Sequence, residues 1–226
     1  MDFNEHKDSY VETIENSLQF TGKSHDFFTQ VKADFLKNIL KKYLPYVKSP
    51  RLLDIGCGHG LIHKHLKDTD LEIVGVEMAA EVVALAQQSN PEVVYQSHDG
   101  KTLPFESQTF DVAMAICVMH HVPKREWASF MQEMKRVIKP GGLAVIFEHN
   151  PYNPVTRHIV ANNPLDEDAV LLSSLTLKKL MHQAGFLRVN SRYILFTPFA
   201  HRIFNWFDKI FGRIPLGAQY YSIGKV

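Results

Sequence analysis

The residues best suited to chemistry gather around a glycine-rich turn in the stretch RLLDIGCGHG, residues 51–60. A short apolar run ends in Asp54, and glycines then alternate at Gly56, Gly58 and Gly60 before an amphipathic run begins. Alternate glycines permit a sharp turn and let a ligand approach the backbone with no Cβ in the way, and the following helix offers unpaired N–H groups. The turn predicts a nucleotide-type site, although GCGHG lacks the third glycine of the dinucleotide pattern.

Two acids follow at the ends of the next predicted strands. Glu77 ends the apolar run EIVGV about twenty residues beyond the glycines, a spacing at which a carboxylate accepts hydrogen bonds from both hydroxyls of a ribose. An acid in this position can instead serve only to cap the next helix. Asp99 follows the third short strand, where a carboxylate can accept a hydrogen bond from the exocyclic amine of adenine. Together with the turn, these acids predict a nucleoside-binding site.

Two histidines, His121 and His149, follow the fourth and fifth predicted strands, where a substrate meets the carboxyl ends of a parallel sheet. Successive side chains of an extended segment point in opposite directions, so His120 and His121 cannot both face the site. His149 can act as a general base or orient a loop by hydrogen bonding. Glu148 beside it is a third candidate.

Another group of histidines, His59, His63 and His65, contains one pair with the four-residue spacing of a metal site. His59 lies in the turn and His65 is offset by two positions, so the three side chains face different ways. No cysteine or carboxylate completes a ligand set. We therefore expect surface histidines here and no bound metal.

Composition favours one domain in a reducing compartment. The chain has 226 residues, of which 45% are hydrophobic, and a net charge of +1, so it can bury one core and has no field that would attract nucleic acid. The cysteines, Cys57 and Cys117, fall at predicted strand ends rather than in a disulfide framework. The N-terminus is polar and acidic, unlike a signal peptide, and no apolar run approaches the length of a membrane span. We expect a cytoplasmic protein.

The apolar periodicity predicts alternating strands and helices. Two helices open the chain, one from about residue 5 to 18 that covers the ligand site with Tyr10 nearest to it, and a longer one from Ser24 to Pro45. Strands are expected at 51–55, 71–76, 93–96, 109–116, 143–150, 186–196 and 218–224, with further helices at 61–66, 79–88 and 175–184.

The landmarks of the chain, taken in order, are DIGCGHG, GVE, HDGKTLPF, FDVAMAICVMHHV, EMKRVIKPGG and LAVIFEHN. As a set they resemble the class I S-adenosylmethionine-dependent methyltransferases over residues 35–150, and LPF, FD and KPGG most resemble the small-molecule branch that includes the ubiquinone and menaquinone methyltransferases. The resemblance implies an α/β fold: a Rossmann-like, doubly wound sheet of seven strands in the order 3-2-1-4-5-7-6, with strand 7 antiparallel and an N-terminal helical cap. We expect a single methyltransferase domain over 1–226, made of the cap (1–45), a cofactor-binding half (46–150) and the substrate-side loops, helix and last two strands (151–226).

The resemblance also implies which residues bind the cofactor, S-adenosylmethionine. The expected contacts are Asp54, Gly56 and Gly58 for the methionine end, Glu77 for the ribose, Met78 against the adenine, Asp99 with Gly100 for the adenine amine and ring, and Cys117 after the fourth strand. This cofactor has no phosphate, which explains the departure from the dinucleotide pattern. We favour His121 over His120 as the residue that faces the site because it aligns with a histidine that many family members carry, often as a residue that shapes the site rather than as a base.

The last third of the chain carries its individual features. The turn-rich stretch 151–154 and the segment 155–168 are expected to lie over the site as a lid. The aromatic segment 199–213 is expected to be a helix that packs on its own domain, with a dimer contact or a peripheral membrane contact as alternatives. The ending IPLGAQYY resembles a subgroup of bacterial methyltransferases, some of which modify glycans or other surface and secondary metabolites, and this resemblance would place Tyr220 or Tyr221 near the acceptor.

We therefore expect methyl transfer from S-adenosylmethionine to a small molecule, favouring oxygen as the acceptor atom and leaving carbon and nitrogen as alternatives. The acceptor we consider is an apolar, lipid-linked or glycan-type metabolite, and S-adenosylhomocysteine is the product. Transfer from a sulfonium depends mainly on alignment and on exclusion of water. One alternative is a protein or RNA methyltransferase, which would need a basic groove. Another is a regulatory protein that binds the cofactor without catalysis. Asn150-Pro151-Tyr152 resembles the motif of adenine-N6 methyltransferases, but that motif follows the fourth strand, so we expect no nucleic-acid partner.

Overall fold

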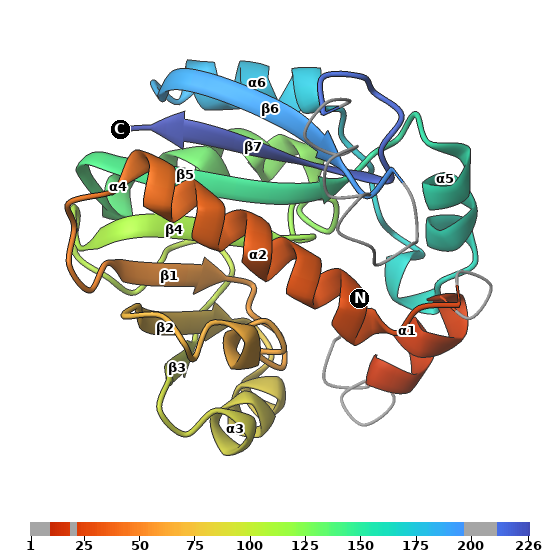
Figure 1. Cartoon of the computed structure of the whole chain (residues 1–226), viewed down its shortest axis with the longest axis horizontal. Helices are drawn as coiled ribbons and strands as arrows, with labels where there is room; N and C mark the ends of the chain where they lie inside the picture. Colours follow the sequence, from red (N-terminus) through yellow and green to blue (C-terminus); the bar gives the residue numbers. More distant parts are fainter. Residues whose placement is uncertain (1–9, 19–21, 197–211) are drawn as a thin grey trace.

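A seven-stranded sheet runs through the centre of the molecule (Figure 1), which a computed structural model describes over residues 10–18, 22–196 and 212–226. The strand order is β3-β2-β1-β4-β5-β7-β6, and β7 runs antiparallel to both of its neighbours, which confirms the predicted topology. The strands are β1 (Arg51–Ile55), β2 (Glu72–Glu77), β3 (Val94–Ser97), β4 (Phe110–Ile116), β5 (Ile138–His149), β6 (Leu187–Ile194) and β7 (Gln219–Lys225).

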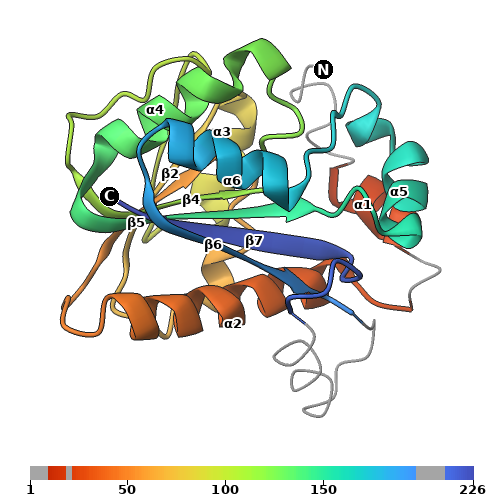
Figure 2. The same cartoon turned by 90° about the horizontal axis from the view of Figure 1, so that it is seen from above.

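Helices cover both faces of the sheet (Figure 2). On one face lies α2 (His25–Tyr43), and on the other lie α4 (Trp127–Val137) and α6 (Ser174–Gln183). The central strands β4 and β5 are therefore buried on both faces, which is why their sequences are almost continuously apolar. A further helix, α3 (Ala80–Ser89), packs against β2 and β3.

Helix α2 shows why the chain folds locally as predicted. The hydroxyl of Ser24 caps it by accepting a hydrogen bond from the N–H of Phe27 at 3.3 Å. Its buried stripe includes Ala33 and Leu36, which pack on Leu52 of β1 within one apolar cluster. This packing fixes the helix over the middle of the sheet, with its first turns at the edge where the parallel strands end (Figure 1).

Three short elements gather at that same edge: α1 (Tyr10–Leu18), α5 (Pro154–Ala161) and the 3₁₀ turn η5 (Pro164–Asp166). The expected lid is thus largely helical. Asn153 caps α5 by accepting a hydrogen bond from the N–H of Thr156 at 3.0 Å, and the Thr156 hydroxyl donates to the carbonyl of Ala218 at 2.7 Å. These bonds tie α5 to the start of β7.

Other differences from the predictions are small. The expected helix at 61–66 is a 3₁₀ turn, η3 (His63–His65), and a second 3₁₀ turn, η4 (Lys124–Glu126), precedes α4. The side chain of Tyr10 and the segment 199–211 lie outside the described residues, so the predictions for them stay predictions. Within the described ranges, no helix has the length and apolar character needed to cross a bilayer.

Candidate active site

A cavity of about 640 Å³ lies at the carboxyl ends of β1, β4 and β5. The glycine turn forms part of its wall, histidines from the ends of β4 and β5 form another part, and α1, α2, α5 and η5 also line it. Six of the predicted site residues line this one cavity: Asp54, Gly56, Gly58, Cys117, His121 and His149. The structure therefore brings together the predicted cofactor turn and the predicted acceptor histidines.

The glycine turn needs its glycines for two different reasons. Gly56 has a φ of +70°, and a Cβ there would lie 2.6 Å from a methyl of Val118, so the position allows no side chain. Gly58 has a φ of +50°, and a Cβ there would meet nothing within 4 Å. The N–H groups of Gly56 and Cys57 both donate to the carbonyl of Val76, at 2.8 and 3.0 Å, which ties the turn to β2. The backbone at Gly58 is thus held in place and open toward the cavity.

Asp54 lines the cavity below this turn and is almost fully buried. Its Oδ2 lies 3.0 Å from Nε2 of His63, whose other ring nitrogen lies 2.5 Å from the hydroxyl of Tyr95. Its Oδ1 is buried and has no hydrogen-bond partner among the described residues. A buried carboxylate oxygen without a partner is costly, so the position suits a cationic ligand group such as an ammonium.

The interpretation of His63 as a surface histidine is wrong. Its exposed fraction is 1%, because the 3₁₀ turn η3 directs the ring inward between Asp54 and Tyr95 rather than outward from a helix. His63 thereby orients the Asp54 carboxylate.

Glu77 stands beside the turn at the end of β2. Its Oε2 accepts from the N–H of Gly58 at 3.2 Å, and its Oε1 accepts from Met78 at 2.7 Å and from Ala79 at 3.3 Å. Ala79 is the N-cap position of α3, so the helix-capping alternative describes part of what Glu77 does. The bond to Gly58 places the same carboxylate next to the backbone that faces the cavity.

The residues predicted to bind adenine lie beyond the cavity lining. Met78 is 63% exposed, and its sulfur would lie 2.7 Å from a Cβ on Gly100, so these two residues are in contact. Oδ1 of Asp99 accepts from the N–H groups of Lys101 and Thr102, each at 2.8 Å, and so shapes an exposed turn. Neither Met78, Asp99, Gly100 nor Glu77 lines the cavity itself.

The segment after β4 is a turn, not an extended strand. Cys117 adopts a φ of +56° and donates its N–H to the carbonyl of Phe147, and the N–H of His121 donates to the carbonyl of Val118 at 3.0 Å. Consequently the rule of alternating side chains does not apply, and both His120 and His121 line the cavity. The prediction that only one of them faces the site is wrong.

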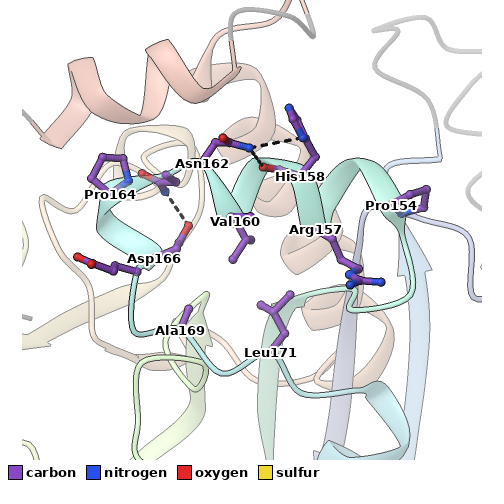
Figure 3. A pocket seen from close by; sticks show the side chains of 12 residues that line it. Pro154, Arg157, His158, Val160, Asn162, Pro164, Asp166, Ala169 and Leu171 are labelled. Carbon is purple, nitrogen blue, oxygen red and sulfur yellow. Dashed lines mark hydrogen bonds between the residues drawn. The ribbon is translucent and has the colours of Figure 1, made fainter.

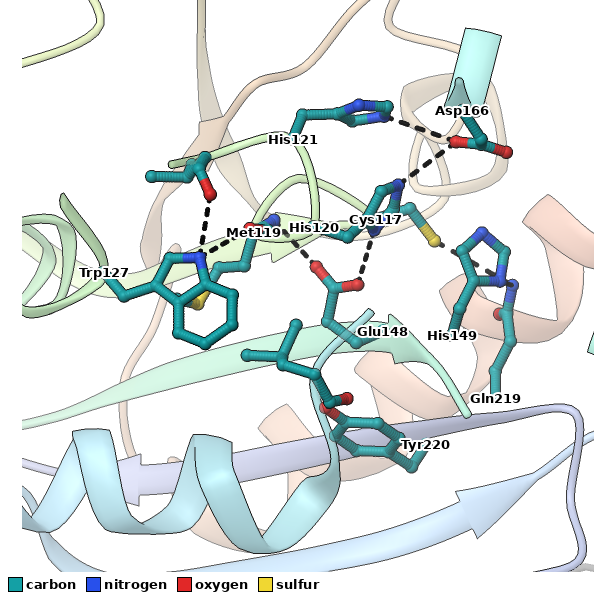
Figure 4. A network of polar contacts seen from close by, with 12 residues as sticks. Cys117, Met119, His120, His121, Trp127, Glu148, His149, Asp166, Gln219 and Tyr220 are labelled. Atoms are coloured by element: carbon teal, nitrogen blue, oxygen red, sulfur yellow. Dashed lines mark hydrogen bonds and ion pairs between the residues drawn. The ribbon is translucent and has the colours of Figure 1, made fainter. Parts of the chain in front are cut away.

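His120 is the centre of a buried polar network (Figure 4). Its Nδ1 lies 2.6 Å from Oε2 of Glu148, while Oε1 of Glu148 accepts from the N–H of Met119 at 2.8 Å. Burial opposes ionisation of His120 and of Glu148, but their mutual attraction outweighs it, raising the pKa of His120 well above its ordinary value and lowering the pKa of Glu148. Glu148 therefore acts on His120 rather than on a substrate.

The rings of His121 and His149 flank that of His120, with centroids 4.2 and 5.1 Å away. Burial lowers the pKa of each flanking histidine to about 4, and the charge of His120 adds to this effect. Nδ1 of His149 lies 3.4 Å from Nε2 of Gln219, which is its register partner on β7. Two neutral imidazoles thus line the cavity at neutral pH.

The two tyrosines expected near the acceptor lie elsewhere. The hydroxyl of Tyr220 donates to the carbonyl of Leu172 at 2.8 Å, and Tyr221 packs on Phe35 and Phe147. Consecutive residues of β7 point to opposite faces of the sheet, and it is Gln219, at the start of the strand, that lines the cavity.

Several cavity residues carry no signal in the sequence that would have identified them. Lys32 lines the cavity from α2 with an exposed fraction of 5%, and within the described ranges its side chain makes no hydrogen bond or ion pair. His25 lines the same cavity two helical turns before Lys32, and its pKa is lowered to about 4 by burial and by the charge of Lys32. Both belong to an amphipathic helix whose pattern predicts packing alone.

A second, more open hollow of about 830 Å³ lies on the other side of α5 (Figure 3). It is lined by residues such as Pro154, Arg157 and His158, and it shares Asn163 and Asp166 with the main cavity. Asp166 therefore stands in the wall between the two hollows.

Comparison with known proteins adds independent findings. A family model described as "Methyltransferase domain" matches residues 53–146. The ubiquinone biosynthesis O-methyltransferase of Roseobacter denitrificans is 26% identical over 198 residues, which cover 82% of this chain and 76% of that protein. The demethylmenaquinone methyltransferase of Chlorobaculum parvum is 29% identical over 157 residues, covering 65% of this chain and 64% of that protein.

Among solved structures, the fold is similar to that of an S-adenosylmethionine-dependent methyltransferase from Thermotoga maritima described as a possible histamine N-methyltransferase. The TM-score is 0.69 at 19% identity, and the similarity covers 99% of this chain and 97% of the other. The shared fold thus extends over nearly the whole chain.

Proposed function

We propose that this chain is a class I S-adenosylmethionine-dependent methyltransferase, as the match to the methyltransferase family model and the similar curated proteins support, and that it methylates a hydroxyl oxygen of a small-molecule acceptor. The observation that carries the proposal is the single cavity that is lined by both the glycine turn and the histidines after β4 and β5. Direct methyl transfer needs donor and acceptor in one enclosed space, in line and without water between them.

The residues around the turn fit the cofactor. The buried Oδ1 of Asp54 lacks a partner among the described residues and would accept the ammonium of the methionine end, and the open backbone at Gly58 allows close approach. Glu77 would hold the ribose, Met78 with Asp99 and Gly100 the adenine, and Cys117 the region near the sulfur. When bound, the cofactor supplies a methyl group already activated by the positive charge on its sulfur.

His121 and His149 are the proposed catalytic residues. Both rings are neutral at pH 7 because burial lowers their pKa, so either can form a hydrogen bond with the acceptor hydroxyl or receive its proton as the methyl group is transferred. Lys32 supplies a buried cation in the same cavity and would stabilise the oxyanion left when the hydroxyl loses its proton. A site that can accept the proton of a hydroxyl and stabilise the resulting oxyanion favours oxygen over carbon or nitrogen as the acceptor atom.

The acceptor is proposed to be an apolar or aromatic metabolite, including lipid-linked or glycan-type compounds with such a part. Phe28, Ile159 and Leu165 contribute apolar surface to the cavity. A net charge of +1 supports a small molecule over nucleic acid as partner. The two unpaired cysteines support a reducing, cytoplasmic compartment. A dimer or membrane contact through 199–213 stays a prediction.

Parallel calorimetric titrations with S-adenosylmethionine, S-adenosylhomocysteine and NAD test the cofactor. We expect micromolar binding of the first two and none of NAD. A panel of phenols, hydroquinones, amines and carbon acids, followed by the release of S-adenosylhomocysteine, then tests the acceptor. Turnover confined to amines would refute the oxygen assignment, and binding without turnover on any class would favour the regulatory alternative.

A further inference from the structure

Three side-chain donors converge on one point in the cavity wall: His120, His121 and Asp166 (Figure 4). Oδ1 of Asp166 lies 3.4 Å from Nε2 of His120 and 3.5 Å from Nε2 of His121, and the three ligand atoms all lie within 4.8 Å of one another. The histidines come from the turn after β4, and Asp166 comes from η5, more than forty residues later.

The two separations from Oδ1 of Asp166 fit ligands around an ion better than they fit hydrogen bonds. A charged hydrogen bond between imidazole and carboxylate is about 2.7–2.9 Å long, as the His120–Glu148 contact nearly is. Two ligands at about 2.0–2.1 Å from a tetrahedral ion lie about 3.4 Å apart. Around an octahedral Mg²⁺ adjacent ligands lie only about 2.9 Å apart, and Mg²⁺ prefers oxygen ligands.

The groups behind these ligands are arranged as at known metal centres. Nδ1 of His120 bonds Glu148, which leaves Nε2 directed at the gap, and a carboxylate behind a metal-binding histidine is the common outer partner. Asn163 donates to Oδ2 of Asp166 at 2.6 Å, which holds that carboxylate with Oδ1 turned toward the two imidazoles. His120 and Asp166 are therefore each oriented by a hydrogen bond through a different atom from the one proposed to bind the metal.

The burial of the carboxylates is consistent with an ion at this point. Glu148 is fully buried and Asp166 is nearly so, and they lie on opposite sides of the His120 ring. Buried charges persist where they are paired or coordinate a metal.

We propose that His120, His121 and Asp166 bind one divalent transition-metal ion of the zinc class, in a three-ligand site whose fourth position opens into the cavity. Two imidazoles and a carboxylate with an open position are the ligand set of catalytic zinc sites. The open position would take an oxygen ligand, such as water or a hydroxyl, and bound metal lowers the pKa of such a group. With the ion bound, His121 is a ligand, and His149 is the residue that would receive the acceptor's proton. Use of the metal-bound oxygen as methyl acceptor rests on the proposed function, whereas binding of the ion does not.

This site differs from the histidine group that the sequence suggests. His63 is engaged by Asp54 and Tyr95, and His65 bonds Asp26 on the surface, so neither is available to complete a shared ligand set. The expectation of no bound metal rested on that group alone.

The test uses the purified full chain without a histidine tag, stripped with chelator and titrated with ZnCl₂ or CoCl₂ in the absence of cofactor and acceptor. We expect one equivalent of Zn²⁺ by calorimetry and by metal analysis after gel filtration. Bound Co²⁺ is expected to show the intense visible absorption of a tetrahedral site. Because neither cofactor nor acceptor is present, failure of the proposed methyl transfer would not affect this result.

Variants assign the ligands. Asp166→Asn and His121→Gln are expected to weaken Zn²⁺ binding at least a hundredfold and to abolish the tetrahedral Co²⁺ spectrum. Glu148→Gln, which alters only the outer partner, is expected to weaken binding about 10–100-fold with the stoichiometry unchanged. His182→Gln, on the exposed side of α6, is the matched control and is expected to bind as the wild type does.

Thermal melts verify that each variant is folded. If Glu148→Gln does not fold, the two cavity-side variants decide the question. Absence of saturable one-to-one binding in the wild type, or unchanged binding in Asp166→Asn and His121→Gln, would overturn the proposal.

Discussion

Replacing Glu77 by alanine removes the carboxylate that joins the glycine turn to the proposed ribose position. An ionised carboxylate offers about four acceptor positions, and three backbone N–H groups occupy three of them in the structure. One acceptor position is therefore open to a full hydrogen bond from one ribose hydroxyl. The other ribose hydroxyl must share an acceptor position with a backbone N–H group. A hydrogen bond to a charged group contributes about 1.5–3 kcal/mol, so we expect a loss of about 2 kcal/mol, or roughly a 30-fold rise in Kd.

Calorimetric titration with S-adenosylhomocysteine measures this change. Glu81→Ala is the matched control, because Glu81 is an exposed acid in the first turn of α3, and the affinity of this variant is expected to equal that of the wild type. Loosening of the glycine turn is a competing cause, since Glu77 also holds Gly58. A 2′-deoxy analogue separates the two causes: its affinity should fall in the wild type but change little further in Glu77→Ala. Unchanged Kd in Glu77→Ala, or full additivity of the two changes, would refute the assignment of the ribose to Glu77.

Three further predictions use other parts of the site. Gly58→Ala places a Cβ on a backbone with a φ of +50° where the glycine turn is open toward the cavity. We therefore expect a stability loss of about 1–2 kcal/mol in denaturant melts and, separately, a weaker cofactor affinity in calorimetry. His149→Gln is expected to lower kcat about 10²–10⁴-fold in the S-adenosylhomocysteine release assay with cofactor Kd unchanged, whereas His182→Gln should leave kcat unchanged; equal rates would remove His149 from catalysis. The pKa of His25 is about 4 in the folded chain against 6.5 in the unfolded chain, so the unfolded state alone takes up this proton between pH 6.5 and 4, and stability falls as the pH falls through that window. The Tm of His25→Gln should therefore fall less than that of the wild type between pH 7 and pH 5. An equal fall in both proteins would show that His25 does not cause the loss of stability.

Short-range pattern accounts for most of what could be predicted of the fold. The apolar runs that became β1, β2 and β4 lie within a residue or two of their predicted bounds, because a buried parallel strand needs an uninterrupted apolar sequence. The residues proposed to bind the cofactor in and beside the turn could be predicted for a similar reason, since Gly56, Gly58 and Glu77 stand at fixed offsets from strand ends. Glu77 accepts a hydrogen bond from the N-cap residue of α3 and another from Gly58, so spacing alone could not separate the helix-capping role from the proposed ribose role.

The positions of most strands along the chain, the glycine turn and the neighbouring acids were thus determined by the sequence itself, because each depends on residues close together in the chain. The order of the strands in the sheet was predicted only through the family resemblance. Tertiary structure decided the rest. A left-handed Cys117 turned the segment after β4 so that His120 and His121 share the cavity, and η5 then brought Asp166 to them from a distant part of the chain. Such convergence depends on how loops pack over the edge of the sheet, and no local periodicity encodes that packing.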